Sequence, residues 1–65
     1  MIETERFYSI ILNSYLEGRI ICEEDLTLDE AKKIVDENYK NQTDTGDSWV
    51  IVTTTSEVDY ESPHK

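Results

Sequence analysis

The chain has 65 residues, with 15 Asp and Glu against 6 Lys and Arg, and its formal net charge is −9 at pH 7. A chain of this length forms one domain and buries only ~60% of the surface that it exposes when unfolded. The negative charge disfavours direct binding to nucleic acid and to anionic membrane surfaces, because both carry the same sign. Hydrophobic residues make up 37% of the chain and occur in blocks, so we expect a folded body.

Residues 7–16, the first hydrophobic block, are compatible with two structures. Apolar side chains between Tyr8 and Tyr15 recur at helical spacing, and Gly18 is then a residue that ends a helix. The first half of the block instead has strand propensity, and Gly18 then closes a hairpin with residues 19–22. We favour the hairpin, because a lone strand over residues 19–22 would need a distant partner.

A helix is predicted over residues 28–39. Thr27 and Glu30 form a capping box, in which each side chain bonds to the backbone N–H of the other residue. Leu26 before the cap and Ala31 in the first helical turns are spaced for a hydrophobic staple. One apolar stripe completes the pattern and consists of Leu28, Ala31, Ile34, Val35 and Tyr39.

The stretch of residues 41–48 has no large apolar side chain and is predicted to be a loop. Residues 49–55 are rich in β-branched side chains and are predicted to form a strand. The resulting fold class is α+β: a small ββαβ domain with one helix packed on a three-stranded antiparallel sheet, or a four-stranded one if the tail adds a strand. The alternative, with a helix at the N-terminus, is αβαβ.

We expect residues 1–56 to form the domain and residues 57–65 to be an acidic C-terminal tail, either an extra strand or flexible. In the tail, carboxylates alternate with apolar residues, as in an extended segment with one acidic face. Same-face residues on a strand repeat every ~6.6 Å, about twice the spacing of phosphates along one DNA strand. The tail carboxylates therefore suggest DNA mimicry; they are Glu57, Asp59 and Glu61.

The histidine and the cysteine, the residues most often used in catalysis or metal binding, do not indicate an active site. His64 is the only histidine and lies in the tail, where a general base would not be held in place. Cys22 is the only cysteine and lies in an apolar block, so we expect a small buried hydrophobe. One Cys and one His cannot form a structural zinc site. We therefore expect no enzyme, no metal and no cofactor, and a cytoplasmic location, since neither a secretory signal nor an apolar run of ~20 residues is visible.

Five carboxylates are expected to crowd the junction between the second strand and the helix. Opposite charge steers encounter and sets the register of a complex. Together with the tail carboxylates, these residues are the predicted contacts to a basic protein partner: Glu23, Glu24, Asp25, Asp29 and Glu30.

The predicted elements follow one another as a hairpin with Gly18 followed by Arg19, a helix that opens at residues 26–29, and a final strand. This order resembles that of the small phage-encoded uracil-DNA glycosylase inhibitors. The second strand differs, because it is Tyr-rich in that family. The resemblance implies a ββαβ homodimer with an acidic rim that covers the DNA-binding surface of a host glycosylase.

The sequence thus favours an acidic protein-binding module of phage or mobile-element type, an inhibitor that covers a basic, DNA-binding surface of a host protein such as a uracil-DNA glycosylase. The alternative is a structural or assembly protein that forms a homo-oligomer and has no inhibitory role. This alternative predicts that the copies meet through apolar strand or helix faces, and the candidates for self-association are Tyr8, Tyr15 and Trp49.

Overall fold

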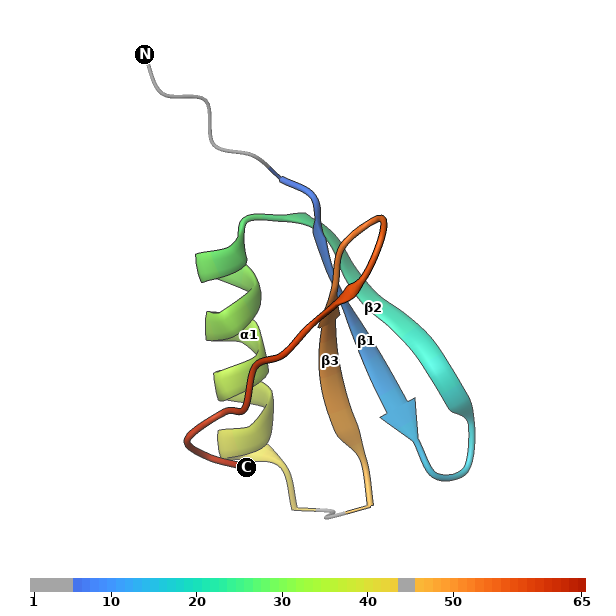
Figure 1. Cartoon of the computed structure of the whole chain (residues 1–65). Coiled ribbons are helices and arrows are strands. Elements are labelled where there is room, and N and C mark those ends of the chain that lie inside the picture. Colours follow the sequence, from blue (N-terminus) through green and yellow to red (C-terminus); the bar gives the residue numbers. More distant parts are fainter. Residues whose placement is uncertain (1–5, 44–45) are drawn as a thin grey trace.

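The computed structural model describes residues 6–43 and 46–65, so residues 44 and 45 of the expected loop lie outside the described part. One helix packs against one face of a sheet, as Figure 1 shows. The elements are β1 (Tyr8–Ser14), β2 (Gly18–Leu26), α1 (Leu28–Asn41), β3 (Ser48–Val52) and β4 (Glu57–Val58).

The four strands form one antiparallel sheet in the order β2-β1-β3-β4. The N-terminal block is therefore the first strand of a hairpin, and the αβαβ alternative is wrong. β1 is hydrogen-bonded on both sides, to β2 and to β3, which explains why strand propensity prevails over the helical spacing of the same residues. Gly18 begins β2 with a φ of 81°, a left-handed conformation that suits glycine.

The second strand is longer than predicted, because β2 continues from Cys22 to Leu26 through the acidic residues. Its register against β1 shifts twice, on either side of Ile10, so that extra residues of β2 are accommodated as bulges. Asp25 takes a left-handed φ of 57° near the end of the strand. Cys22 is exposed, and the prediction of a buried cysteine is wrong. The reason is that β2 is an edge strand whose bulge displaces this residue from the regular alternation.

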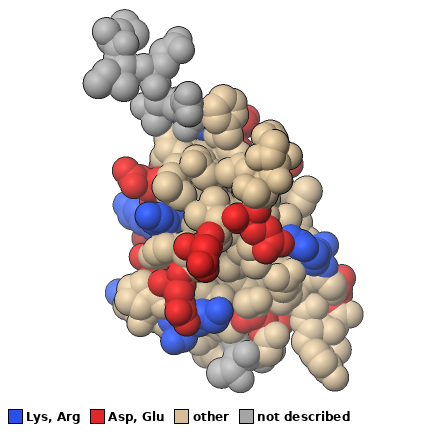
Figure 2. Space-filling view, in the orientation of Figure 1, with Lys and Arg blue, Asp and Glu red and all other residues tan. Residues whose placement is uncertain are grey.

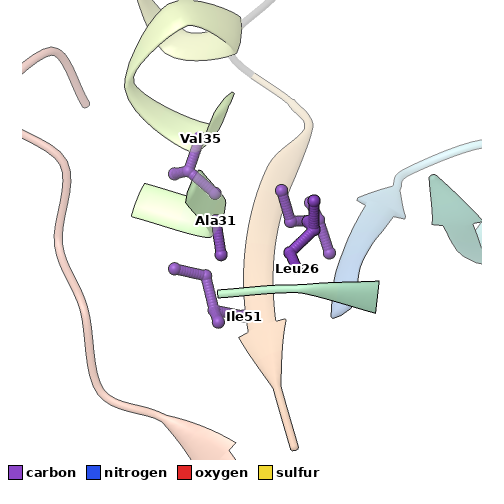
Figure 3. Packing of buried hydrophobic residues seen from close by; sticks show 5 residues of the cluster. Leu26, Ala31, Val35 and Ile51 are labelled. Carbon is purple, nitrogen blue, oxygen red and sulfur yellow. The ribbon is translucent and has the colours of Figure 1, made fainter. Parts of the chain in front are cut away.

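The helix forms where it was predicted and extends two residues further, to Asn41. Both bonds of the capping box are present: the Glu30 N–H donates to Thr27 Oγ1 and the Thr27 N–H donates to Glu30 Oε1, each at 3.1 Å. Figure 3 shows Ala31 and Val35 of α1 and Ile51 of β3 close together in the core. The buried cluster consists of Ile10, Leu26, Ala31, Val35 and Ile51.

The third strand ends at Val52, three residues earlier than predicted. Thr53 begins a turn in which its hydroxyl accepts hydrogen bonds from the backbone N–H groups of Thr55 and Ser56, at 3.3 and 3.0 Å. The Thr53 N–H also donates to the Ser56 carbonyl at 2.7 Å. Such side-chain bonds compete with strand pairing, and the chain turns back here to form β4. The sheet is thus four-stranded.

Candidate functional site

The five predicted carboxylates at the strand–helix junction form what we call the acidic corner. The end of β2 carries three of them, and the first turn of α1 carries the other two. Leu26 and Thr27 connect these elements without a loop; Leu26 is buried in the core, and Thr27 caps the helix. Strand end and helix start are therefore held close together. The acidic corner consists of Glu23, Glu24, Asp25, Asp29 and Glu30.

One member of the acidic corner has a structural role. The Glu30 carboxylate accepts the Thr27 N–H, and these bonds with Thr27 lower the pKa of Glu30 below its ordinary value. Partial desolvation opposes this shift, whereas Arg6, whose Nη1 atom lies 3.7 Å from Glu30 Oε1, adds to it. Glu30 therefore remains ionised, but its oxygens are already engaged within the chain.

The three acidic residues of β2 are exposed. Their carboxylates make no hydrogen bond or ion pair within residues 6–43 and 46–65. Only the main-chain oxygen of Asp25 is engaged, by Arg6 at 3.4 Å. Glu23, Glu24 and Asp25 are thus available to an external cation.

The tail carboxylates are arranged differently from the acidic corner. Glu57 lies in β4 and pairs with Arg19 of β2, with 3.2 Å between Arg19 Nη2 and Glu57 Oε1. Asp59 and Glu61 are exposed and follow β4, so only Glu57 of the three lies in a strand. On the face shown in Figure 2, acidic side chains form separate groups with uncharged and basic side chains between them. On this face the acidic side chains thus do not form one continuous surface.

Beyond β4, the tail runs over α1, as Figure 1 shows; we call residues 59–65 the strap. The Tyr60 hydroxyl donates to Asp36 Oδ1 of α1 at 2.7 Å, and its ring lies 5.3 Å from Lys32 Nζ. Ser62 is only 4% exposed, and its hydroxyl accepts the His64 N–H at 3.1 Å. The bond from Tyr60, followed by the nearby Ser62 hydroxyl, lowers the pKa of Asp36, and the same bond raises the pKa of Tyr60. The tail is thus attached to the helix.

An open groove of about 450 Å³ lies between α1 and the strap. Sequence reasoning missed it, although charges at spacings of three and four residues along the helix indicate one charged face. The three acidic and three lysine side chains balance each other, so the groove does not select ligands by sign. Its lining residues are Asp29, Lys32, Lys33, Asp36, Glu37, Lys40, Tyr60 and His64.

The three residues predicted for self-association occupy different positions. Tyr8 and Trp49 are half-buried and pack against the core. The Trp49 ring meets the Tyr39 ring edge-on, with centroids 5.0 Å apart, and the Tyr39 hydroxyl accepts the Trp49 backbone N–H at 3.0 Å. Tyr15 alone of the three is exposed, at 86%.

No group of three or more His, Cys, Asp or Glu side chains in the described part of the chain is placed to hold a metal ion. Over the same residues, the single helix is too short and too polar to cross a bilayer. The chain matches no protein-family model, and comparisons with curated proteins and with solved structures find no match.

Proposed function

We propose that this chain is an acidic protein-binding module, an inhibitor of phage or mobile-element type that covers a basic, DNA-binding surface of a host protein. The observation that carries the proposal is the acidic corner. Three exposed carboxylates on consecutive residues of an edge strand, Glu23 to Asp25, have no partner within the described residues.

The local structure supports a docking role for these carboxylates. Consecutive like charges repel one another, and β2 holds them together because its end is tied to the buried Leu26 and the capped helix. A basic surface that meets this edge would relieve the repulsion. Complementary charge of this kind chiefly raises the association rate and selects the partner. Because Arg6 and the capping box engage Glu30, the β2 carboxylates are expected to dominate the contact.

The experiment compares two variants of equal net charge. In the corner variant, Glu23→Gln, Glu24→Gln and Asp25→Asn remove the exposed charges; Asn also tolerates the left-handed backbone of residue 25. In the matched control, Glu37→Lys and Asn41→Lys make the same total change in charge at exposed positions of α1, outside both predicted contact groups. Both variants have a net charge of −6.

Purified bacterial uracil-DNA glycosylase is the first target to test, by excision of uracil from a labelled oligonucleotide. We expect inhibition by the wild type and about tenfold slower association of the corner variant at low salt, with little change in the control. Equal losses in both variants would show that binding follows net charge alone and would contradict the proposal.

A pull-down from bacterial lysate at low and moderate salt tests the proposal beyond this enzyme. We expect wild-type chain to retain a basic protein that the corner variant does not retain. Recovery of no basic partner at either salt, together with a stable homo-oligomer of both variants by analytical ultracentrifugation, would favour the structural alternative.

A further inference from the structure

The turn between β1 and β2 carries the two most exposed of the large hydrophobic side chains in the described part of the chain. Tyr15 is 86% exposed and Leu16 is 88% exposed, compared with 61% for Ile21. Figure 1 shows this turn projecting at the end of the hairpin, away from α1. Single exposed apolar residues are normal on protein surfaces. Here two adjacent ones, Tyr15 and Leu16, are exposed at a projecting turn, which we call the apolar tip.

Hydrogen bonds hold the backbone of the apolar tip in place. The Leu16 and Glu17 N–H groups both donate to Ser14 Oγ at 3.3 Å, and the Tyr15 N–H donates to Asp47 Oδ1 at 3.3 Å. Gly18 then turns the chain into β2 with a positive φ. The tip is therefore ordered before any partner binds, which reduces the entropy lost on binding.

The charges around the apolar tip indicate which partner it fits. Glu17 is exposed directly beside it, and the Asp47 carboxylate lies at its backbone. The nearest cation in sequence, Arg19, is engaged by Glu57 at 3.2 Å. The tip is thus an apolar projection with an acidic rim.

Three kinds of occupant are disfavoured by this charge. A nucleic acid and an anionic bilayer are repelled by the rim and by the net charge of −9. A second copy of the chain would bring two acidic rims together. A protein pocket with an apolar floor and a basic rim is complementary both to the side chains and to the charges around them.

We propose that the apolar tip inserts Tyr15 and Leu16 into an apolar pocket rimmed by Lys or Arg on a protein partner. The inference rests on the proposed function only in that it takes the partner to be a basic protein. The tip and the acidic corner lie at opposite ends of β2, so the two contacts are separable.

The test places a photo-crosslinking residue, p-benzoylphenylalanine, at position 16 of the full chain and irradiates it in bacterial lysate. The same residue at the exposed Thr54 is the background control, and at Glu24 it reports on the acidic corner. We expect one discrete protein adduct from position 16, with the linked residue located by mass spectrometry in an apolar pocket flanked by Lys or Arg.

Competition by unlabelled chains shows whether the side chains matter. An excess of wild type, or of the conservative Tyr15→Phe/Leu16→Met variant, should abolish the adduct. The Tyr15→Ser/Leu16→Ser variant should compete at least about tenfold less well. Because both side chains are almost fully exposed, this variant is expected to keep the circular dichroism spectrum and melting temperature of the wild type.

The inference would be overturned if position 16 gave no adduct above the Thr54 background, or if the serine variant competed as well as wild type. Adducts confined to lipid, to nucleic acid or to a second copy would overturn it too. If the crosslinker at position 24 gave an adduct and the one at position 16 gave none, the apolar tip would be rejected and the acidic corner would be kept. The reverse result would reject the acidic corner and keep the tip.

Discussion

Ile10 shows how one residue connects the layers of this small domain. It lies on β1, one of the two central strands, pairs with Ile51 of β3, and is completely buried beneath α1. Only five hydrophobic residues of the described chain are buried, so each forms a large share of the core. A domain of this size has little stability to spare, and we expect the core to tolerate few changes.

Shortening this side chain should therefore have a large effect on stability. Ile10→Val is expected to lower the free energy of unfolding by about 0.5–1.5 kcal/mol, and Ile10→Ala by about 2–5 kcal/mol. Urea denaturation followed by Trp49 fluorescence measures both. The matched control is Ile21→Val on β2, where the side chain is 61% exposed and the change should stay within about 0.5 kcal/mol. Equal shifts at both positions would contradict the assigned core.

At the scale of elements, the attachment of the strap to α1 depends on two ionisable groups. Tyr60 donates its hydroxyl proton to the Asp36 carboxylate, so the bond requires a protonated Tyr60 and an ionised Asp36. The pKa of Asp36 is lowered from 3.8, so its contribution to stability is present above pH 3.8 and is lost as the pH falls through the lowered value. The pKa of Tyr60 is raised from 10.0, so its contribution is present below pH 10.0 and is lost as the pH rises through the raised value.

The variant Tyr60→Phe removes this bond while keeping the ring. We expect the variant to be less stable than wild type by a constant amount between about pH 5 and pH 9, with the difference shrinking below pH 4 and above pH 10. Denaturant titrations across this range give the difference. Tyr15→Phe, whose ring is exposed, is the control and should show no such dependence. A difference that persisted unchanged at pH 2.5 would exclude an ionised Asp36 as the acceptor.

At the scale of the whole molecule, repulsion between carboxylates opposes folding. The net charge is −9, and the described residues form only two ion pairs, Arg6–Glu30 and Arg19–Glu57, both partly exposed. Exposed pairs of this kind contribute little to stability. Salt therefore screens more repulsion than attraction in this chain.

The melting temperature is expected to rise when NaCl is increased from 10 to 150 mM. The Debye length falls from about 30 Å to about 8 Å over this range, whereas the two shorter dimensions of the molecule are 22 and 17 Å. Calorimetry measures the shift, and a variant that neutralises Glu37, Asp59 and Glu61 should show a smaller one. A melting temperature that fell with added salt would mean that attractive pairs dominate.

The amino-acid sequence by itself determined the helix and its start. The capping box, the staple and the apolar stripe act within a few residues of one another, so their effect does not depend on the rest of the fold. The alternation of the tail also predicted an extended segment with an acidic face and an apolar face; in the structure, Val58 and Tyr60 pack against the core while Glu57 is exposed. Composition gave the acidic surplus and the candidate residues of the acidic corner.

Only the tertiary structure decided the features that depend on distant partners. Residues 7–16 carry both helical spacing and strand propensity, and pairing of β1 on both sides selected the strand. The edge position and bulge of β2 exposed Cys22, and the packing of the strap on α1 made the groove. The exposure of the apolar tip likewise follows from where the hairpin projects. These outcomes depend on which surfaces meet, and residue order within a short window does not specify that.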